Sequence, residues 1–149
     1  MDGFFANMYE LFGLLLLGPN GQFSQDMYQN GIYNPIAIWM FITVALFVVL
    51  YYFVINHARL SKAGWWILWG GIVSLINFGI AWWIADEQLF LLYDSMQMAM
   101  PYGAMTEFFP FCCIVFFWAF FYYLLFSVVV KRFSVNGRHT PWKSAWPKH

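Results

Sequence analysis

Charged residues are scarce in this 149-residue sequence. Asp, Glu, Lys and Arg together make up 9% of the chain, whereas soluble domains contain roughly 25%. Hydrophobic residues make up 62% of the chain and aromatic residues 24%. Because so few charges cannot cover a surface that faces water, most of the chain must face lipid or other apolar protein. The shortage of charge excludes an ordinary soluble domain and indicates an integral membrane protein.

Three long runs of the chain contain no charged side chain. Each exceeds the ~18 apolar residues that are typical of a membrane-spanning helix. We therefore expect one all-α membrane domain with three transmembrane helices, over residues 35–57, 63–85 and 108–130. Proton relays, ion-coupled carriers and voltage sensors need ionisable groups inside the membrane. The uncharged spans thus argue against pumps and secondary transporters.

Motifs of catalysis and cofactor binding are also missing. The chain has no phosphate-binding glycine loop, no CxxC pair and no HExxH, and nothing places a nucleophile beside a base. The two cysteines, Cys112 and Cys113, are adjacent in sequence. On a helix they point about 100° apart, which suits neither a shared metal nor a disulfide between them. We interpret them as buried, inert thiols, and we expect neither enzyme activity nor a cofactor.

The few charges are sorted by sign into alternating blocks along the chain. All seven acids lie within residues 1–34 or 86–107, and all seven bases lie within 59–62 or 131–149. Basic loops stay in the cytoplasm, according to the positive-inside rule. The sequence therefore predicts a multi-pass protein of the inner (cytoplasmic) membrane, with its N-terminus outside and its C-terminus inside.

Two segments on the predicted outer side have the pattern of amphipathic helices that lie at the membrane surface. Within residues 1–34, the segment 4–17 places its polar residues on one helical face and its large apolar residues on the other. Within the loop 86–107, apolar residues share a face from Leu89 to Met96, and a helix is expected to end near Pro101. Residues 22–34 are polar and rich in Asn and Gln.

The second span carries a row of small and polar residues on one helical face. Trp residues bracket this span, and between them small or polar residues recur at helical spacing: Gly70, Ser74, Asn77 and Ala81. One interpretation is helix packing, with close approach at the small residues and hydrogen bonds from the polar ones. The other is a pore lined by this face in a ring of subunits, with Asp86 and Glu87 at its outer mouth.

The C-terminal segment 131–149 is basic and holds two Trp residues. We predict that it attracts anionic lipid, or that it docks a cytoplasmic partner. The residues concerned are Lys131, Arg132, Arg138, Trp142, Lys143 and Trp146. The patch is small and lies next to the bilayer, so we expect no nucleic-acid partner.

Methionines are frequent in the outer loop, where the thioethers of Met96, Met98 and Met100 are weak candidate ligands for Cu(I). The spacing favours an apolar contact surface instead, because Met98 points away from the other two and no His or Cys joins them. Copper uptake channels share the three-span arrangement. This chain lacks their Met-x-x-x-Met in span two and their Gly-x-x-x-Gly in span three, so no family is assigned.

We expect a non-enzymatic subunit that anchors or assembles a larger membrane complex, with itself or with other membrane proteins, through its transmembrane helices. The alternative is a homo-oligomeric channel or small, holin-like pore lined by the polar face of span two. A third possibility is an accessory subunit of a respiratory or copper oxidase complex.

Overall fold

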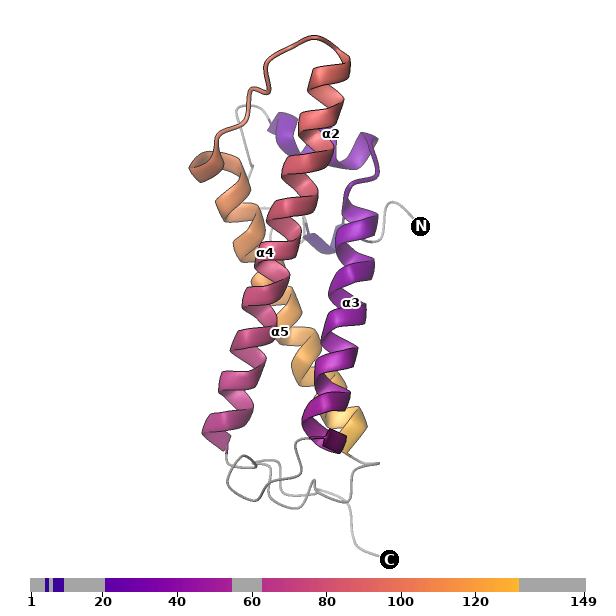
Figure 1. Cartoon of the computed structure of the whole chain (residues 1–149), viewed down its shortest axis with the longest axis vertical. Helices are drawn as coiled ribbons and strands as arrows, with labels where there is room; N and C mark the ends of the chain where they lie inside the picture. Colours follow the sequence, from indigo (N-terminus) through magenta and orange to yellow (C-terminus); the bar gives the residue numbers. More distant parts are fainter. Residues whose placement is uncertain (1–4, 6, 10–20, 55–62, 132–149) are drawn as a thin grey trace, which may run out of the picture.

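The computed structural model describes residues 5, 7–9, 21–54 and 63–131 (Figure 1). Regular structure in these parts of the chain is helical throughout. The elements are α2 (Gln22–Gln29), α3 (Tyr33–Val49), the π-helix η2 (Leu50–Val54), α4 (Ala63–Ser95), the π-helix η3 (Ala104–Phe108) and α5 (Phe109–Lys131). Three stretches are long and apolar enough to cross a membrane, namely Tyr33–Phe53, Gly64–Ser95 and Ala104–Lys131.

The three long helices form an elongated antiparallel bundle in which α3, α4 and α5 each contact the other two (Figure 1). The short helix α2 lies at the end of the bundle where α3 begins and α4 ends. We call this the acidic end, because it holds Asp26, Asp86, Glu87, Asp94 and Glu107. The opposite end, where α5 finishes at Lys131, is called the basic end.

Small and medium-sized apolar residues lie where the three long helices meet in the core of the bundle. Val44 of α3, Val73 and Ala81 of α4, and Val115 and Ala119 of α5 are all fully buried. Lipid tails are as apolar as these side chains, so helices in a membrane associate through close packing rather than through exclusion of water. Small residues permit that close approach. Large apolar residues on the outer faces of the three helices are left exposed, as lipid-facing residues are.

Helix α4 is longer than the sequence predicts. The expected separate surface helix after residue 85 is instead a direct continuation of span two as far as Ser95. Ala85 and Leu89 are fully buried, so the inward face of span two continues beyond the charged pair and holds the helix to the bundle. The helix ends where Gln97 adopts a left-handed backbone conformation, with φ 57°.

Helix α2 falls within a segment for which the sequence indicates only polar composition. Phe23 and Met27, four residues apart, are fully buried, while Gln22, Gln25 and Gln29 are exposed. Such i, i+4 spacing gives a short helix one apolar stripe. Gly21 and Gly31, both with positive φ, flank the helix. They allow the sharp turns that fold it onto the bundle.

Two boundaries of the spans differ from the prediction. Span one begins at Tyr33, two residues before Pro35, and Pro35 still lies in the first turn, where a missing N–H costs little. The α-helix of span three begins at Phe109, but η3 precedes it and adds one wide turn that includes Glu107.

The N-terminal surface helix predicted over 4–17 falls mostly outside the described residues. Residues 5 and 7–9 are helical, and Met8 and Tyr9 are buried. The ring of Tyr9 stacks on that of Tyr33, with centroids 5.5 Å apart, and the hydroxyl of Tyr122 donates to the sulfur of Met8 at 3.1 Å. This part of the segment therefore packs against the bundle.

Candidate functional site

The polar row of α4 lies inside the three-helix core. Gly70 is buried, Ser74 and Ala81 are fully buried, and Asn77 is only 1% exposed. Gly70 faces α5, because a Cβ at this position would lie 2.8 Å from ring carbons of Tyr123. The hydroxyl of Ser74 donates back to the carbonyl of Gly70 at 2.9 Å. Each of these four residues therefore faces the core of the helical bundle that a single chain forms.

Asn77 is hydrogen-bonded to α3. Its Nδ2 donates to the carbonyl of Val73 at 2.9 Å, which leaves its Oδ1 directed at Thr43, 2.8 Å from the hydroxyl. The Thr43 hydroxyl also lies 2.8 Å from the carbonyl of Trp39 and 3.0 Å from that of Met40, both in the preceding turn. A hydroxyl has one hydrogen, so these two carbonyl oxygens and the Asn77 Oδ1 compete for it. The buried amide therefore has its partner within the same chain.

Polar groups join the helices at two further levels nearer the basic end. The indole N–H of Trp69 donates to the carbonyl of Phe47 on α3 at 3.2 Å. The hydroxyl of Tyr123 on α5 donates to the carbonyl of Trp66 on α4, also at 3.2 Å. Together with the Thr43 contact, these bonds fix α3 and α5 against α4. A membrane interior strongly favours such internal satisfaction of polar groups.

At the acidic end, one carboxylate joins three segments of the chain. Oδ2 of Asp26, on α2, accepts hydrogen bonds from the hydroxyls of Tyr93 on α4, at 2.6 Å, and Tyr102 in the following loop, at 2.5 Å. The two hydroxyls lie 3.2 Å apart. The ring of Phe23, also on α2, meets the ring of Tyr102 edge-on, with centroids 5.2 Å apart. Sequence reasoning missed this site, because 67 residues separate Asp26 from Tyr93.

Burial raises the pKa of the Tyr102 hydroxyl well above its usual value, and the hydrogen bond and negative charge of Asp26 raise it further. The physical reason is that an apolar setting disfavours the phenolate, and a neighbouring carboxylate repels it. The phenol therefore stays protonated across the physiological range. It can donate a hydrogen bond to Asp26 but cannot act as a base there.

Glu107 is a second acid with an internal role. It is only 5% exposed, and its Oε2 accepts hydrogen bonds from the backbone N–H of Gly103, at 2.8 Å, and from the hydroxyl of Thr106. A carboxylate in this position satisfies one of the unpaired N–H groups at the start of a helix. Glu107 thus anchors the first turn of span three, a role that composition did not reveal.

The other predicted site residues that the structure describes lie apart from the polar row. Asp86 and Glu87 are exposed on α4, and Met96 and Met98 are exposed beyond it, while Met100 is half-buried against the core. Cys112 is buried, Cys113 is half-buried, and both are free thiols. Among the tail residues, Lys131 is half-buried at the end of α5. Arg132, Arg138, Trp142, Lys143 and Trp146 lie outside the described residues.

The described parts of the chain contain no group of three or more His, Cys, Asp or Glu residues that could hold a metal ion. The polar groups described above pair with one another and hold helices together. Comparison of the chain with protein-family models, with curated proteins and with solved structures found no match.

Proposed function

We propose that this protein is a non-enzymatic membrane subunit that anchors or assembles a larger membrane complex through its transmembrane helices. In this proposal it sits in the inner (cytoplasmic) membrane, with the acidic end outside and the basic segment 131–149 in the cytoplasm. Span two holds the chain together, and the outer faces of the helices are the contact surfaces.

The observation that carries the proposal is the inward orientation of the polar row on α4. Asn77 is paired with Thr43, and Gly70 packs directly against Tyr123. The exposed surface of the middle of α4 consists instead of apolar residues such as Ile72 and Leu75. A folded unit with an apolar exterior suits lateral contact with lipid and with other membrane helices.

A pore built from the same row is disfavoured by this geometry. To line a channel, Ser74 and Asn77 would have to face away from α3 and α5, which would break the bond to Thr43 and expose the core. Conductance of the purified protein in planar bilayers separates the two functions. We expect no current from the wild type, whereas a current that Asn77→Leu alters would establish the channel instead.

Purification in a mild detergent tests the subunit function directly. The tagged full-length chain should elute together with other membrane proteins at fixed ratios, identified by mass spectrometry. Absorbance spectra and metal analysis of the same sample would reveal a haem or copper oxidase complex. Elution as an isolated monomer from several detergents and from lipid nanodiscs would overturn the proposal.

A further inference from the structure

Helix α4 is too long for the membrane that it crosses. From Gly64 to Phe90 it rises about 39 Å at 1.5 Å per residue, against a hydrocarbon core of about 30 Å. At the average tilt of about 20°, the path through the core is about 32 Å, which α4 covers between Gly64 and about Ala85. The last turns of α4, up to Ser95, therefore extend beyond the hydrocarbon.

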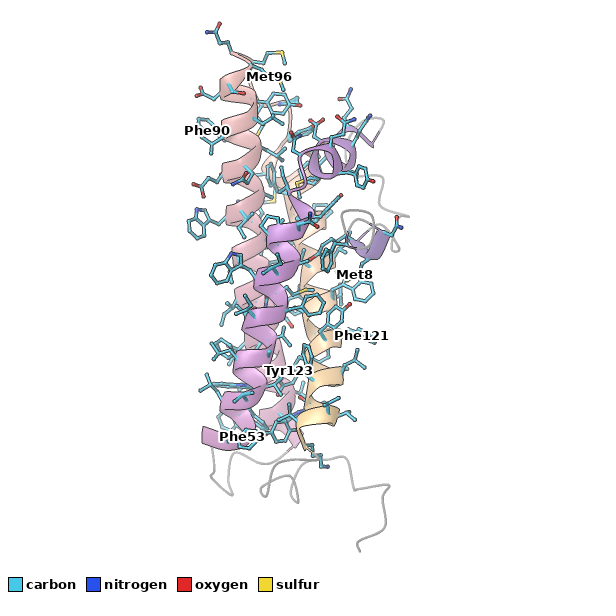
Figure 2. All side chains as sticks on the ribbon, turned by 90° about the vertical axis from the view of Figure 1, so that its right-hand side faces the viewer. Met8, Phe53, Phe90, Met96, Phe121 and Tyr123 are labelled. Atoms are coloured by element: carbon cyan, nitrogen blue, oxygen red, sulfur yellow. The ribbon has the colours of Figure 1, made fainter. Side chains whose placement is uncertain are left out.

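Large apolar side chains continue on the outer side of this projecting part. Trp83 is 67% exposed, Phe90 is 58% exposed and Leu91 is 55% exposed. Figure 2 shows Phe90 on the side of α4 that is turned away from the other helices. Trp83 suits the headgroup layer, but Phe90 and Leu91 lie past the charged pair Asp86 and Glu87, where lipid tails no longer cover them.

Three carboxylates surround these apolar residues. Asp86, Phe90 and Asp94 follow one another at steps of four, and Glu87 and Leu91 form a parallel pair four apart. At about 100° per residue, the set falls within an arc of roughly 140°. We call this set, together with Trp83, the α4 tip face. Among the described residues, none of its three carboxylates has an ion-pair partner.

We propose that the α4 tip face docks a cationic, amphipathic segment of a partner protein, in which apolar side chains cover Phe90 and Leu91 while Lys or Arg residues pair with the surrounding carboxylates. The inference rests on the proposed function, because it specifies the partner of a subunit. Asp86 and Asp94 are separated by about 12 Å along the helix. The matching segment therefore carries basic residues about two helical turns apart.

Charge argues against a second copy of this chain as the occupant. Copies that insert in the same orientation bring the same ends together, so Asp86, Glu87 and Asp94 would face identical carboxylates. All seven bases of the chain lie next to the opposite ends of the spans, within 59–62 and 131–149. An anionic lipid surface is disfavoured for the same reason, since the carboxylates repel it.

Site-specific photocrosslinking in intact cells tests the inference. A benzophenone amino acid replaces Phe90 in the otherwise wild-type, full-length chain, and irradiation is expected to link it to another protein. The crosslinked peptide should contain at least two Lys or Arg residues among apolar ones. Neutralising the tip with Asp86→Asn, Glu87→Gln and Asp94→Asn together should lower the yield about tenfold, because charge pairing at the docking face is lost.

Gln88→Ala provides a matched control, because Gln88 is exposed on the same turn of α4 but lies outside the α4 tip face. The yield from position 90 should be unchanged in this variant. Because all the altered side chains are exposed, each variant should keep the thermal unfolding midpoint of the wild type. That measurement separates loss of docking from loss of folding.

Several results would overturn the inference. They are adducts with a second copy of this chain, adducts with lipid alone, a crosslinked peptide without bases, and a yield that survives neutralisation of the tip. If position 90 gives no protein adduct while partners still co-purify in mild detergent, the docking face is wrong but the subunit function stands. If neither adducts nor co-purifying proteins are found, both proposals fail.

Discussion

The hydroxyl of Tyr102 lies 2.5 Å from Oδ2 of Asp26, although 76 residues separate the two in sequence. The contact joins α2 to the loop between spans two and three, and Tyr93 extends it to α4 through the same oxygen. Hydrogen bonds to a charged acceptor are about twice as strong as neutral ones. The three residues therefore hold together the acidic end from which the α4 tip face projects.

Removing one phenolic hydroxyl tests this role. We expect Tyr102→Phe to lower the free energy of unfolding by about 1–2 kcal/mol, because the bond to a carboxylate is lost while the ring packing on Phe23 is kept. Tyr28→Phe is the control, since Tyr28 is exposed on α2. Unfolding in mixed micelles by SDS titration measures both variants. Equal stability of Tyr102→Phe and the wild type would show that the contact contributes nothing.

The raised pKa of Tyr102 predicts how stability changes with pH. The folded state holds the phenolic proton more tightly than the unfolded state does, so this contribution is fully present below the ordinary tyrosine pKa of about 10. It declines as the pH rises above that value. We expect the unfolding midpoint of the wild type to fall more steeply above about pH 10 than that of Tyr102→Phe. Parallel curves for the two proteins would contradict the assignment.

Gly70 and Gly71 offer a matched pair within one helix. A Cβ at Gly70 would meet Tyr123 at 2.8 Å, whereas nothing lies within 4 Å of one at Gly71. Because Tyr123 is fully buried and donates to Trp66, its ring cannot move freely. We expect Gly70→Ala to destabilise by about 1–3 kcal/mol, and Gly71→Ala to be neutral or slightly stabilising. SDS titration should separate them. If Gly70→Ala left the free energy of unfolding unchanged, the close contact between α4 and α5 would not lie at Gly70.

A double-mutant cycle measures the bond between Thr43 and Asn77. Thr43→Val keeps the shape of the side chain, and Asn77→Leu removes the amide. Interhelical hydrogen bonds in membranes average about 0.6 kcal/mol and reach about 1.7 kcal/mol. We expect a coupling energy in this range from the unfolding free energies of the two single variants and the double variant. Strict additivity would mean that the two side chains do not interact.

Cysteine labelling in intact cells tests the proposed orientation. Cys112 and Cys113 are first replaced by Ala, and single cysteines are then introduced as Asn20→Cys and Ala145→Cys. A membrane-impermeant maleimide should label position 20 from outside the cell, and it should label position 145 only after the membrane is opened. The reverse pattern would invert the orientation and place the α4 tip face in the cytoplasm.

The spans could be predicted from the sequence because they depend on a local property. A run without charge that is long enough to cross a bilayer has few alternatives in lipid, where backbone groups must be bonded within a helix. The residue at which a span ends depends less on the local sequence and more on packing against the other helices. Asp86 and Glu87 end the uncharged run, but Leu89 is buried against the bundle, and α4 continues as far as Ser95. Helix α2 was missed because two apolar residues in a polar segment are a weak signal.

The sequence by itself determined that the chain has three helices long and apolar enough to cross a membrane and that its acids and bases alternate in blocks along it. These properties follow from composition and order along the chain, since each helix in a membrane must satisfy its own backbone. Only the tertiary structure decided which way the polar side of α4 turns and which residues meet Asp26. Those pairings join side chains 34 to 76 residues apart, and the packing of whole helices brings them together.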